Sequence, residues 1–311
     1  MDELEDGVWR VTLPLPTRPG HVHCYVLPGD DGWTLVDTGL GLPDAPERWA
    51  TELAQLDGEI TRILVTHFHP DHVGAAADVA ALTGATVYQG SVDLQQCRLV
   101  WGGTDWSSVL VAWFHRHGAP AGVTRELVAL GSSMSELVRY AVDAVAVDPG
   151  DAIDGWKLVG AAGHADGQLT LLRDGVLIAA DHVLERITPA VGLWPASRPD
   201  PLADYLRSLE RTIELAPRIA YPGHGEPFRE PAHRARQIIA HHRERLHATE
   251  VALTQEPRTG FDVSFDLFGA DLAPATRRFA VAETLSHLER LVNEGRASAR
   301  EDVGIVSYTA G

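Results

Sequence analysis

Three histidines and one aspartate crowd the short stretch Thr66–His72, and their side chains are suited to binding a metal ion. Imidazole nitrogens and carboxylate oxygens are common ligands of zinc and similar divalent ions. The histidines occupy positions 67, 69 and 72, with Asp71 among them. A polar turn with chance histidines is the alternative, since the chain contains 15 histidines in all. The clustering within six positions favours the metal site.

The segments on either side of this cluster predict how it is held. Residues 60–65, Ile-Thr-Arg-Ile-Leu-Val, form a short β-branched and aliphatic run typical of a buried strand. Pro70 suits the first turn of a helix, and an alanine-rich helix is expected to continue to Leu82. The cluster should therefore lie at a strand-to-helix corner, where side chains can converge without bending a regular element.

Three later polar side chains occupy the same kind of position. His164, Asp181 and His224 each follow an apolar run that predicts a strand, at residues 156–159, 176–180 and 218–221. The second of these strands should form a hairpin with residues 169–172 around Asp174-Gly175. A helix beginning at Asp200-Pro201 is expected before the last strand. Strands and helices thus alternate, which indicates an α/β protein.

The ordered set of motifs resembles the signature of the metallo-β-lactamase fold superfamily. The resemblance rests on four motifs and reaches from the start of the chain to about residue 229. It implies an αββα sandwich with the metal ions at one edge of its two sheets. The motifs are His67-x-His69-x-Asp71-His72, Gly163-His164-x-x-Gly167, Ala180-Asp181 and Pro222-Gly223-His224-Gly225.

The resemblance also implies which residue holds which metal ion. His67, His69 and His164 would bind the first ion, and Asp71, His72 and His224 the second. Asp181 would bridge the two ions, which we expect to be zinc, with iron or manganese as alternatives. Two ions sharing a hydroxide would supply a nucleophile near neutral pH, and Asp71 would take or relay a proton after attack. Gln168 departs from the small hydroxylated residue or histidine of many relatives. Five other histidines are expected to be bystanders: His115, His117, His182, His241 and His242.

The first third of the chain predicts a β-meander followed by a helix. Short strands are expected at residues 8–13, 21–27 and 33–36, separated by proline and glycine turns, with a helix at residues 44–56. Asp37 ends the third strand. It could cap the turn or could bond a ligand histidine and set its tautomer.

A helical insertion is expected at about residues 90–145. One amphipathic helix carries an apolar stripe, and shorter helices are predicted at residues 124–130 and from the capping box at Ser133 to about Val142. The stripe could be core packing. It could instead belong to a lid that roofs the metal site and binds an apolar acyl group. Its residues are Trp106, Val109, Leu110, Trp113 and Phe114, of which we predict Trp106, Leu110, Trp113 and Phe114 to bind substrate.

Residues 230–311 are expected to form a separate small domain after a catalytic domain of residues 1–229. A long polar helix begins at Pro231, residues 261–268 follow, and a closing strand is predicted at residues 303–308. Residues 279–288 with 293–296 resemble the C-terminal winged-helix-like domain of one superfamily branch, to which a mitochondrial endoribonuclease belongs. A second helix bears an apolar face that needs a partner surface and suggests a homodimer: Val281, Leu285, Leu288 and Val292.

Composition and charge restrict the partners. The 311 residues include 45% hydrophobic and 22% charged residues, which are ordinary globular values. The formal charge of −17 argues against a nucleic-acid partner, because such surfaces are normally basic. No apolar run long enough for a membrane span occurs, no signal peptide is visible, and the two cysteines are too few for a disulfide framework. We therefore expect a cytoplasmic protein without a membrane partner.

The predicted function is a metal-dependent hydrolase that cleaves a small-molecule thioester, ester or lactone. An endoribonuclease or phosphodiesterase is the first alternative, but residues 257–311 contain eight acidic residues against six arginines. A single-iron oxygenase of the same fold is the second, and metal content would distinguish it. A binding protein without catalysis is disfavoured because every ligand position is present.

Overall fold

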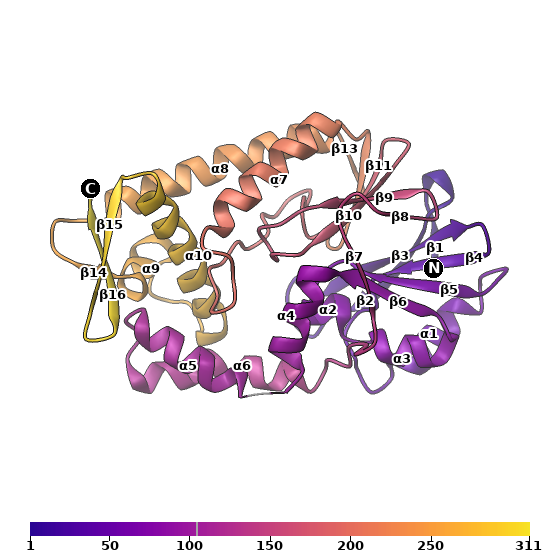
Figure 1. The fold of residues 1–311 in the computed structure, drawn as a ribbon, viewed down its shortest axis with the longest axis horizontal. Helices are drawn as coiled ribbons and strands as arrows, with labels where there is room; N and C mark the ends of the chain where they lie inside the picture. Colours follow the sequence, from indigo (N-terminus) through magenta and orange to yellow (C-terminus); the bar gives the residue numbers. More distant parts are fainter. Residues whose placement is uncertain (104) are drawn as a thin grey trace.

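Two β-sheets packed face to face form the centre of the protein (Figure 1). The computed structural model describes residues 1–103 and 105–311, without the side chains of residues 130–133. The first sheet has seven strands in chain order: β1 (Asp2–Glu3), β2 (Trp9–Pro14), β3 (His21–Gly29), β4 (Gly32–Val36), β5 (Ile60–Val65), β6 (Thr86–Gly90) and β7 (Val145–Val147). The second has six, in the order β13 (Phe228–Arg229), β12 (Ile219–Pro222), β11 (Val176–Ala180), β10 (Leu169–Arg173), β9 (Trp156–Gly160) and β8 (Ala152–Ile153).

Alternating side chains on the strands build the layers. On β3, Tyr25 and Leu27 enter the core between the sheets, whereas Cys24 and Val26 face the opposite way. The outward side is covered by α1 (Ala45–Leu53) and α3 (Ala76–Thr83), with the fully buried Trp49 at its centre. The pairing of β4 with β5 is parallel because α1 connects them as a crossover.

The second sheet is covered on its outer face by two further helices. Val176 and Ile178 of β11 point between the sheets, while Leu177 and Ala179 pack outward. Helix α7 (Pro201–Leu215) and helix α8 (Pro231–Ala252) lie along this outer side (Figure 1). The Asp200 side chain caps α7 by accepting from the Ala203 amide at 2.9 Å, as the sequence predicts. The αββα sandwich is therefore confirmed.

The described residues of the helical insertion form three helices: α4 (Ser91–Trp101), α5 (Trp106–Arg116) and α6 (Ala121–Ser135). The expectation of two short helices after residue 120 is wrong, because one helix runs through to Ser135 and ends there. A single internal glycine costs a helix only about 1 kcal/mol, so position 131 does not break it. The Ser133 side chain of the expected capping box lies outside the described part of the chain. After the insertion, β7 returns to pair in parallel with β6.

The C-terminal residues form two helices and a small sheet. Helices α9 (Gly260–Phe268) and α10 (Pro274–Asn293) precede a sheet in the order β14 (Arg258–Thr259), β16 (Ile305–Ala310) and β15 (Ala297–Asp302). The strand expected from Val303 begins instead at Ile305, because Val303 and Gly304 adopt positive φ angles of 47° and 78° in the hairpin turn. The likeness to a winged helix stays a prediction.

The apolar face of α10 is covered within the chain. Val281, Leu285 and Leu288 are each 0% exposed, and α10 packs against α6, α8 and α9. This face therefore does not offer the dimer contact suggested by the sequence, and the homodimer itself stays a prediction.

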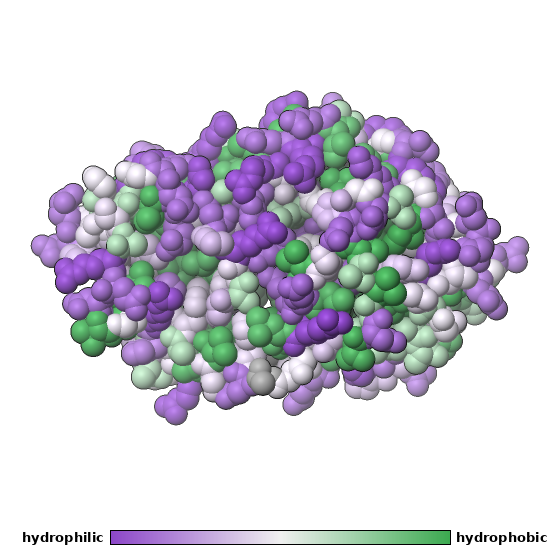
Figure 2. All heavy atoms as spheres, in the orientation of Figure 1, coloured by the Kyte–Doolittle hydropathy of each residue, from purple (hydrophilic) through white to green (hydrophobic). Residues whose placement is uncertain are grey.

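The visible surface is mainly hydrophilic (Figure 2). Hydrophobic spheres gather over the lower centre, in the region that α4 and β7 occupy in Figure 1. Exposed apolar side chains on α4, on β7 and just before β7 include Val92, Leu99, Val142 and Val145. Within the described ranges, no helix has both the length and the apolar character needed to cross a bilayer.

Candidate metal centre

The predicted ligands come from strand ends of both sheets, as the sequence indicates. His67 and His69 follow β5, and the short helix α2 (Pro70–Val73) carries Asp71 and His72. Three loops of the second sheet supply the remaining side chains, after β9, β11 and β12: His164, Asp181 and His224. All seven predicted ligands therefore meet at one edge of the sandwich.

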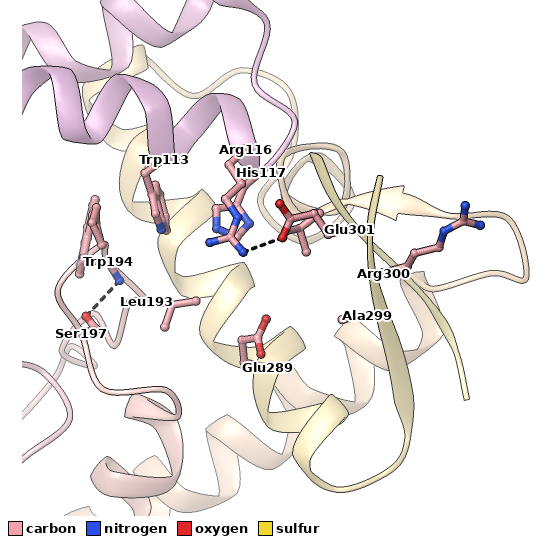
Figure 3. A pocket seen from close by; sticks show the side chains of 12 residues that line it. Trp113, Arg116, His117, Leu193, Trp194, Ser197, Glu289, Ala299, Arg300 and Glu301 are labelled. Carbon is pink, nitrogen blue, oxygen red and sulfur yellow. Dashed lines mark hydrogen bonds and ion pairs between the residues drawn. The ribbon is translucent and has the colours of Figure 1, made fainter. Parts of the chain in front are cut away.

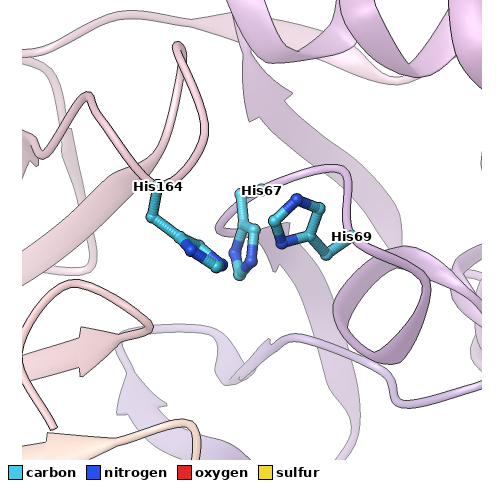
Figure 4. A group of neighbouring side chains, drawn as sticks. All are labelled: His67, His69 and His164. Atoms are coloured by element: carbon cyan, nitrogen blue, oxygen red, sulfur yellow. The ribbon is translucent and has the colours of Figure 1, made fainter. Parts of the chain in front are cut away.

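The first group consists of three imidazoles. One potential ligand atom from each of His67, His69 and His164 lies within 4.8 Å of the others. Figure 4 shows the three rings converging from two separate loops. The ring centroids of His69 and His164 are 4.4 Å apart, and those of His67 and His69 are 4.7 Å apart. This spacing matches one divalent ion held by three nitrogens.

The second group lies next to the first and combines a carboxylate with two imidazoles. Asp71, His72 and His224 also bring potential ligand atoms within 4.8 Å of one another. The His224 Nε2 atom is 3.3 Å from the Asp71 Oδ2 atom. Such a mixture of nitrogen and oxygen donors suits zinc, iron or manganese.

Asp181 lies between the two groups. Its Oδ2 atom is 3.6 Å from His164 Nε2 and 3.2 Å from His224 Nε2. Its Oδ1 atom is 3.5 Å from His72 Nε2. The carboxylate thus contacts histidines of both groups, as a bridging ligand must. The assignment of each ligand to a particular ion stays a prediction.

Unpaired polar atoms support the presence of a cation here. The Nε2 atoms of His67, His72 and His164 and the Oδ1 atom of Asp181 are buried without a hydrogen-bond partner among the described residues. An unpaired buried polar atom is costly, so its repeated occurrence at one point requires an explanation. A bound divalent ion would satisfy these atoms together. The residues present therefore fit a metal centre.

The hydrogen bonds behind the rings set the tautomers. The Nδ1–H of His72 donates to Asp37 Oδ2 at 2.7 Å, that of His164 to the Ala190 carbonyl at 2.7 Å, and that of His224 to the His21 carbonyl at 2.7 Å. With Nδ1 as the donor, Nε2 is the atom of each ring that faces the centre, where it can bind a metal ion once it carries no proton. Of these three partners, the sequence suggested only Asp37, as a residue that could bond a ligand histidine. The bond from His72 to Asp37 confirms this hypothesis.

Asp37 holds two ligand-bearing segments together. It also accepts from the Thr66 amide and from the Thr66 hydroxyl, both at 2.8 Å, and the same hydroxyl oxygen lies 3.0 Å from His67 Nδ1. Asp37→Ala should therefore weaken metal binding by roughly 10- to 100-fold, a range typical of outer partners of metal ligands. Chelator competition would measure this change. Asp30→Ala, at an exposed turn, is the matched control and should bind metal like the wild type.

Sequence reasoning missed the clamp on the loop of His224. His23 Nε2 lies 2.9 Å from the Gly225 carbonyl, and the His23 amide donates to the Gly223 carbonyl at 2.7 Å. The Gly225 amide in turn donates to His21 Nε2 at 3.1 Å. The alternation of His21 and His23 on β3 was the only sequence signal for this contact.

Gly223 in the last motif and Gln168, which follows the second motif, have structural roles that explain their identity. A Cβ atom on Gly223 would lie 2.4 Å from Asp181 Oδ1, so a larger residue would displace the Asp181 carboxylate. With its amide oriented to satisfy both partners, the Gln168 oxygen accepts from the backbone amides of His182 at 2.9 Å and Asp181 at 3.2 Å. Gln168 therefore supports the loop of Asp181 and does not enter the donor groups.

The two groups differ in protonation without metal. Burial and the neighbouring histidines lower the pKa of His67 well below its usual range, and burial lowers that of His69 to about 3. Burial also lowers the pKa of His224, but Asp181 and Asp71 outweigh it and raise the pKa to about 10. Burial also lowers the pKa of His72, but the charges of Asp37, Asp181 and Asp71 outweigh it. They raise the pKa of His72 well above its usual range. At pH 7 the first group is neutral, whereas His72 and His224 are protonated.

Metal binding should therefore release protons mainly with the second ion. Filling the first group displaces no proton at pH 7, whereas filling the second displaces about two. Protons compete with the second ion for His72 and His224, whose pKa values are raised. The affinity of the second group for metal should therefore decrease from pH 8 to pH 6, while that of the first group changes little. Calorimetry in buffers of different ionisation enthalpy measures this release. Equal proton release for both ions would contradict this difference.

The predicted substrate residues lie on α5, beside the C-terminal helices. Phe114 is 0% exposed, Leu110 and Trp113 are buried, and Trp106 is partly buried. All four belong to or pack against a cluster that also contains Val281 and Leu285 of α10. Their contact with substrate stays a prediction. The five bystander histidines do not enter the donor groups found among the described residues.

Comparisons with known proteins agree with this geometry. Residues 17–224 match the family described as the metallo-beta-lactamase superfamily, and residues 246–310 match the metallo-beta-lactamase-like C-terminal domain. A probable metallo-hydrolase of Bacillus subtilis (strain 168) is 27% identical over 304 residues, which cover 93% of each chain.

Two solved structures are similar over nearly their full length. A metallo-beta-lactamase family protein from Thermus thermophilus has a TM-score of 0.85 and 32% identity, covering 98% of this chain and 99% of that chain. A beta-lactamase domain protein from Burkholderia ambifaria has a TM-score of 0.88 and 29% identity, covering 100% and 94%. With the donor groups at the expected sheet edge, these matches show that the chain belongs to the metallo-β-lactamase superfamily and is a metallo-hydrolase.

Proposed function

We propose that this enzyme uses two zinc ions to hydrolyse an acyl bond of a small molecule, namely a thioester, ester or lactone. The observation that carries this proposal is the pair of adjacent donor groups with Asp181 between them. Two divalent ions at this edge would lower the pKa of a shared water molecule and polarise the carbonyl under attack.

The chain's own residues orient the centre and handle the proton. Burial raises the pKa of Asp71, but His72 and His224 outweigh it and bring the pKa to about 2. Asp71 is therefore ionised at neutral pH in the absence of metal. Its side chain is 22% exposed, so a proton can pass from it to solvent. We propose Asp71 as the catalytic acid–base group.

Two lines of support favour an acyl substrate. The chain carries a net charge of −17, which disfavours a polyanionic substrate such as RNA. A local stretch of 87 residues, 26% of the chain, is 28% identical to an atrochrysone carboxyl ACP thioesterase of a Cryptosporiopsis species. The name of that protein refers to hydrolysis of a thioester. The two proteins are similar over only part of this chain.

Zinc is proposed because the donors are imidazoles and carboxylates in two compact groups. One solved structure, 23% identical in sequence to this chain and with a TM-score of 0.51, is of a protein in a di-iron-bound form. Iron is therefore the first alternative to test.

A substrate panel tests the proposal. The purified enzyme should hydrolyse p-nitrophenyl acetate, an acyl thioester or a homoserine lactone, and a chelator should abolish this activity. Bis-p-nitrophenyl phosphate and a single-stranded RNA should be cleaved far more slowly. Preferential phosphodiester cleavage would replace the acyl hydrolase with the nuclease. Oxygen consumption with one bound iron ion would replace it with the oxygenase.

A further inference from the structure

A pocket of about 420 Å³ lies where the insertion, the loop before α7 and the C-terminal residues meet (Figure 3). Its volume falls within the range of small-molecule sites. Helix α5 supplies Trp113 and Arg116, the loop supplies Leu193 and Trp194, and α10 supplies Glu289. None of these side chains belongs to the metal groups.

One wall of the pocket is aromatic. The rings of Trp113 and Trp194 stack with centroids 5.8 Å apart and an interplanar angle of 27°. Phe279 packs edge-on against Trp194 at 5.8 Å and holds that ring from behind. Figure 3 shows Trp113, Trp194 and Leu193 on the same side of the pocket. Indole faces attract both apolar groups and cations, because the face of the ring is electronegative.

Among the charged residues that line the pocket, one carboxylate has no ion pair within the described part of the chain. Arg116 pairs with Glu301 at 2.9 Å across the pocket rim. Arg300 also lines the pocket, but its guanidinium points away from the middle in Figure 3 and its side chain is 75% exposed. Glu289 accepts from the Tyr308 hydroxyl through Oε1 at 2.7 Å, which leaves Oε2 for another donor.

The imidazole in the wall does not oppose a cation. Burial lowers the pKa of His117 to about 4, so the ring is neutral at pH 7. The groups turned toward the pocket therefore sum to a negative charge: Arg116 and Glu301 cancel, and Glu289 remains. An indole wall beside an available carboxylate is the combination that recognises organic ammonium ions.

The loop that forms the aromatic wall also supports the metal centre. Its Ala190 carbonyl accepts from His164 Nδ1 at 2.7 Å, and its Val191 carbonyl accepts from the Ser286 hydroxyl at 2.7 Å. The Leu193 amide then donates to the Ala282 carbonyl of α10 at 2.9 Å. Ala190, which bonds the predicted metal ligand His164, lies only four residues before Trp194. A molecule bound against Trp194 thus contacts the same loop.

We propose that this pocket binds a small organic cation with an apolar or aromatic body and an ammonium group. The body lies against Trp113, Trp194 and Leu193, and the ammonium group donates to Glu289. Binding of this cation does not require the proposed acyl hydrolysis, since its contacts lie outside the donor groups. Trp113 is the one wall residue that it shares with the side chains expected to contact substrate.

The test compares two probes of similar shape and opposite charge, phenethylammonium and 3-phenylpropanoate, by calorimetry at pH 7. Phenethylammonium should bind the full chain at least about tenfold more tightly, with or without metal, because only it gains the cation–π and carboxylate contacts. Glu289→Gln retains the side-chain shape and should remove most of this preference. Glu210→Gln, an exposed change of equal charge on α7, should leave it intact.

A second variant changes the charge of the pocket at its other carboxylate. Glu301→Gln frees Arg116, so it should weaken binding of the ammonium probe and strengthen binding of the carboxylate probe. Equal affinity for the two probes in the wild type, or a preference that survives Glu289→Gln, would overturn the proposal. Probe binding that disappears on metal removal would place the probe on the metal ions and overturn it as well. None of these readouts requires hydrolytic activity.

Discussion

Replacing His67 with alanine should empty the first metal site and reduce turnover by more than about 100-fold, the upper range for outer partners of metal ligands. His67 is 0% exposed and its ring centroid lies 4.7 Å from that of His69 and 5.2 Å from that of His164. The substitution leaves only His69 and His164 of this group, and it also removes a member of the candidate group of His67, His72 and Asp181. Elemental analysis and steady-state kinetics on the same preparation would measure both effects.

The matched control is His247→Ala on α8, where the imidazole is 75% exposed and outside both donor groups. It should retain wild-type metal content and turnover. A His67→Ala enzyme that remains fully metallated and active would refute the ligand assignment. An enzyme that keeps one ion but loses activity would support it, because the second group would remain intact.

Phe114→Ala should lower the free energy of unfolding by roughly 3 to 5 kcal/mol, as expected for truncating a buried aromatic ring. Phe114 is 0% exposed and packs against Trp113 and Trp194 at ring distances of 4.9 Å and 6.4 Å. The cluster around it joins α5 to the C-terminal helices. Denaturant unfolding monitored by fluorescence and circular dichroism would measure the loss.

The exposed Val109 on the same helix provides the control, since its side chain is 44% exposed. Val109→Ala should change stability by less than about 0.5 kcal/mol. Metal content should be unchanged in both variants. If Phe114→Ala instead leaves stability intact and raises KM only for long or aromatic acyl substrates, the insertion acts as a lid at that residue.

The meeting of the seven candidate ligands could be predicted from the sequence because these residues follow local rules. Each predicted ligand lies within four residues after an apolar strand or in α2, so hydrophobic pattern and residue type together located it. The bond from His72 to Asp37 was foreseeable for the same reason, as Asp37 directly follows β4. Side-chain chemistry at strand ends is visible in a linear sequence.

Other partners could not be predicted because they depend on long-range backbone contacts. The carbonyls of His21 and Ala190 accept from ligand histidines 203 and 26 residues away, and a carbonyl has no sequence signature. The apolar face of α10 was expected to need a second chain, since the sequence does not show that α6, α8 and α9 cover it. The pocket of Trp194 likewise arises only where three separate segments meet.

The metal stoichiometry of the wild-type enzyme tests the central claim most directly. Purified without chelator and analysed by inductively coupled plasma mass spectrometry, the protein should contain about two zinc ions per chain. His67→Ala and His224→Ala should each reduce the content to about one, because each removes a ligand of a different group. A wild-type enzyme that is fully active with a single ion would contradict the two-metal account.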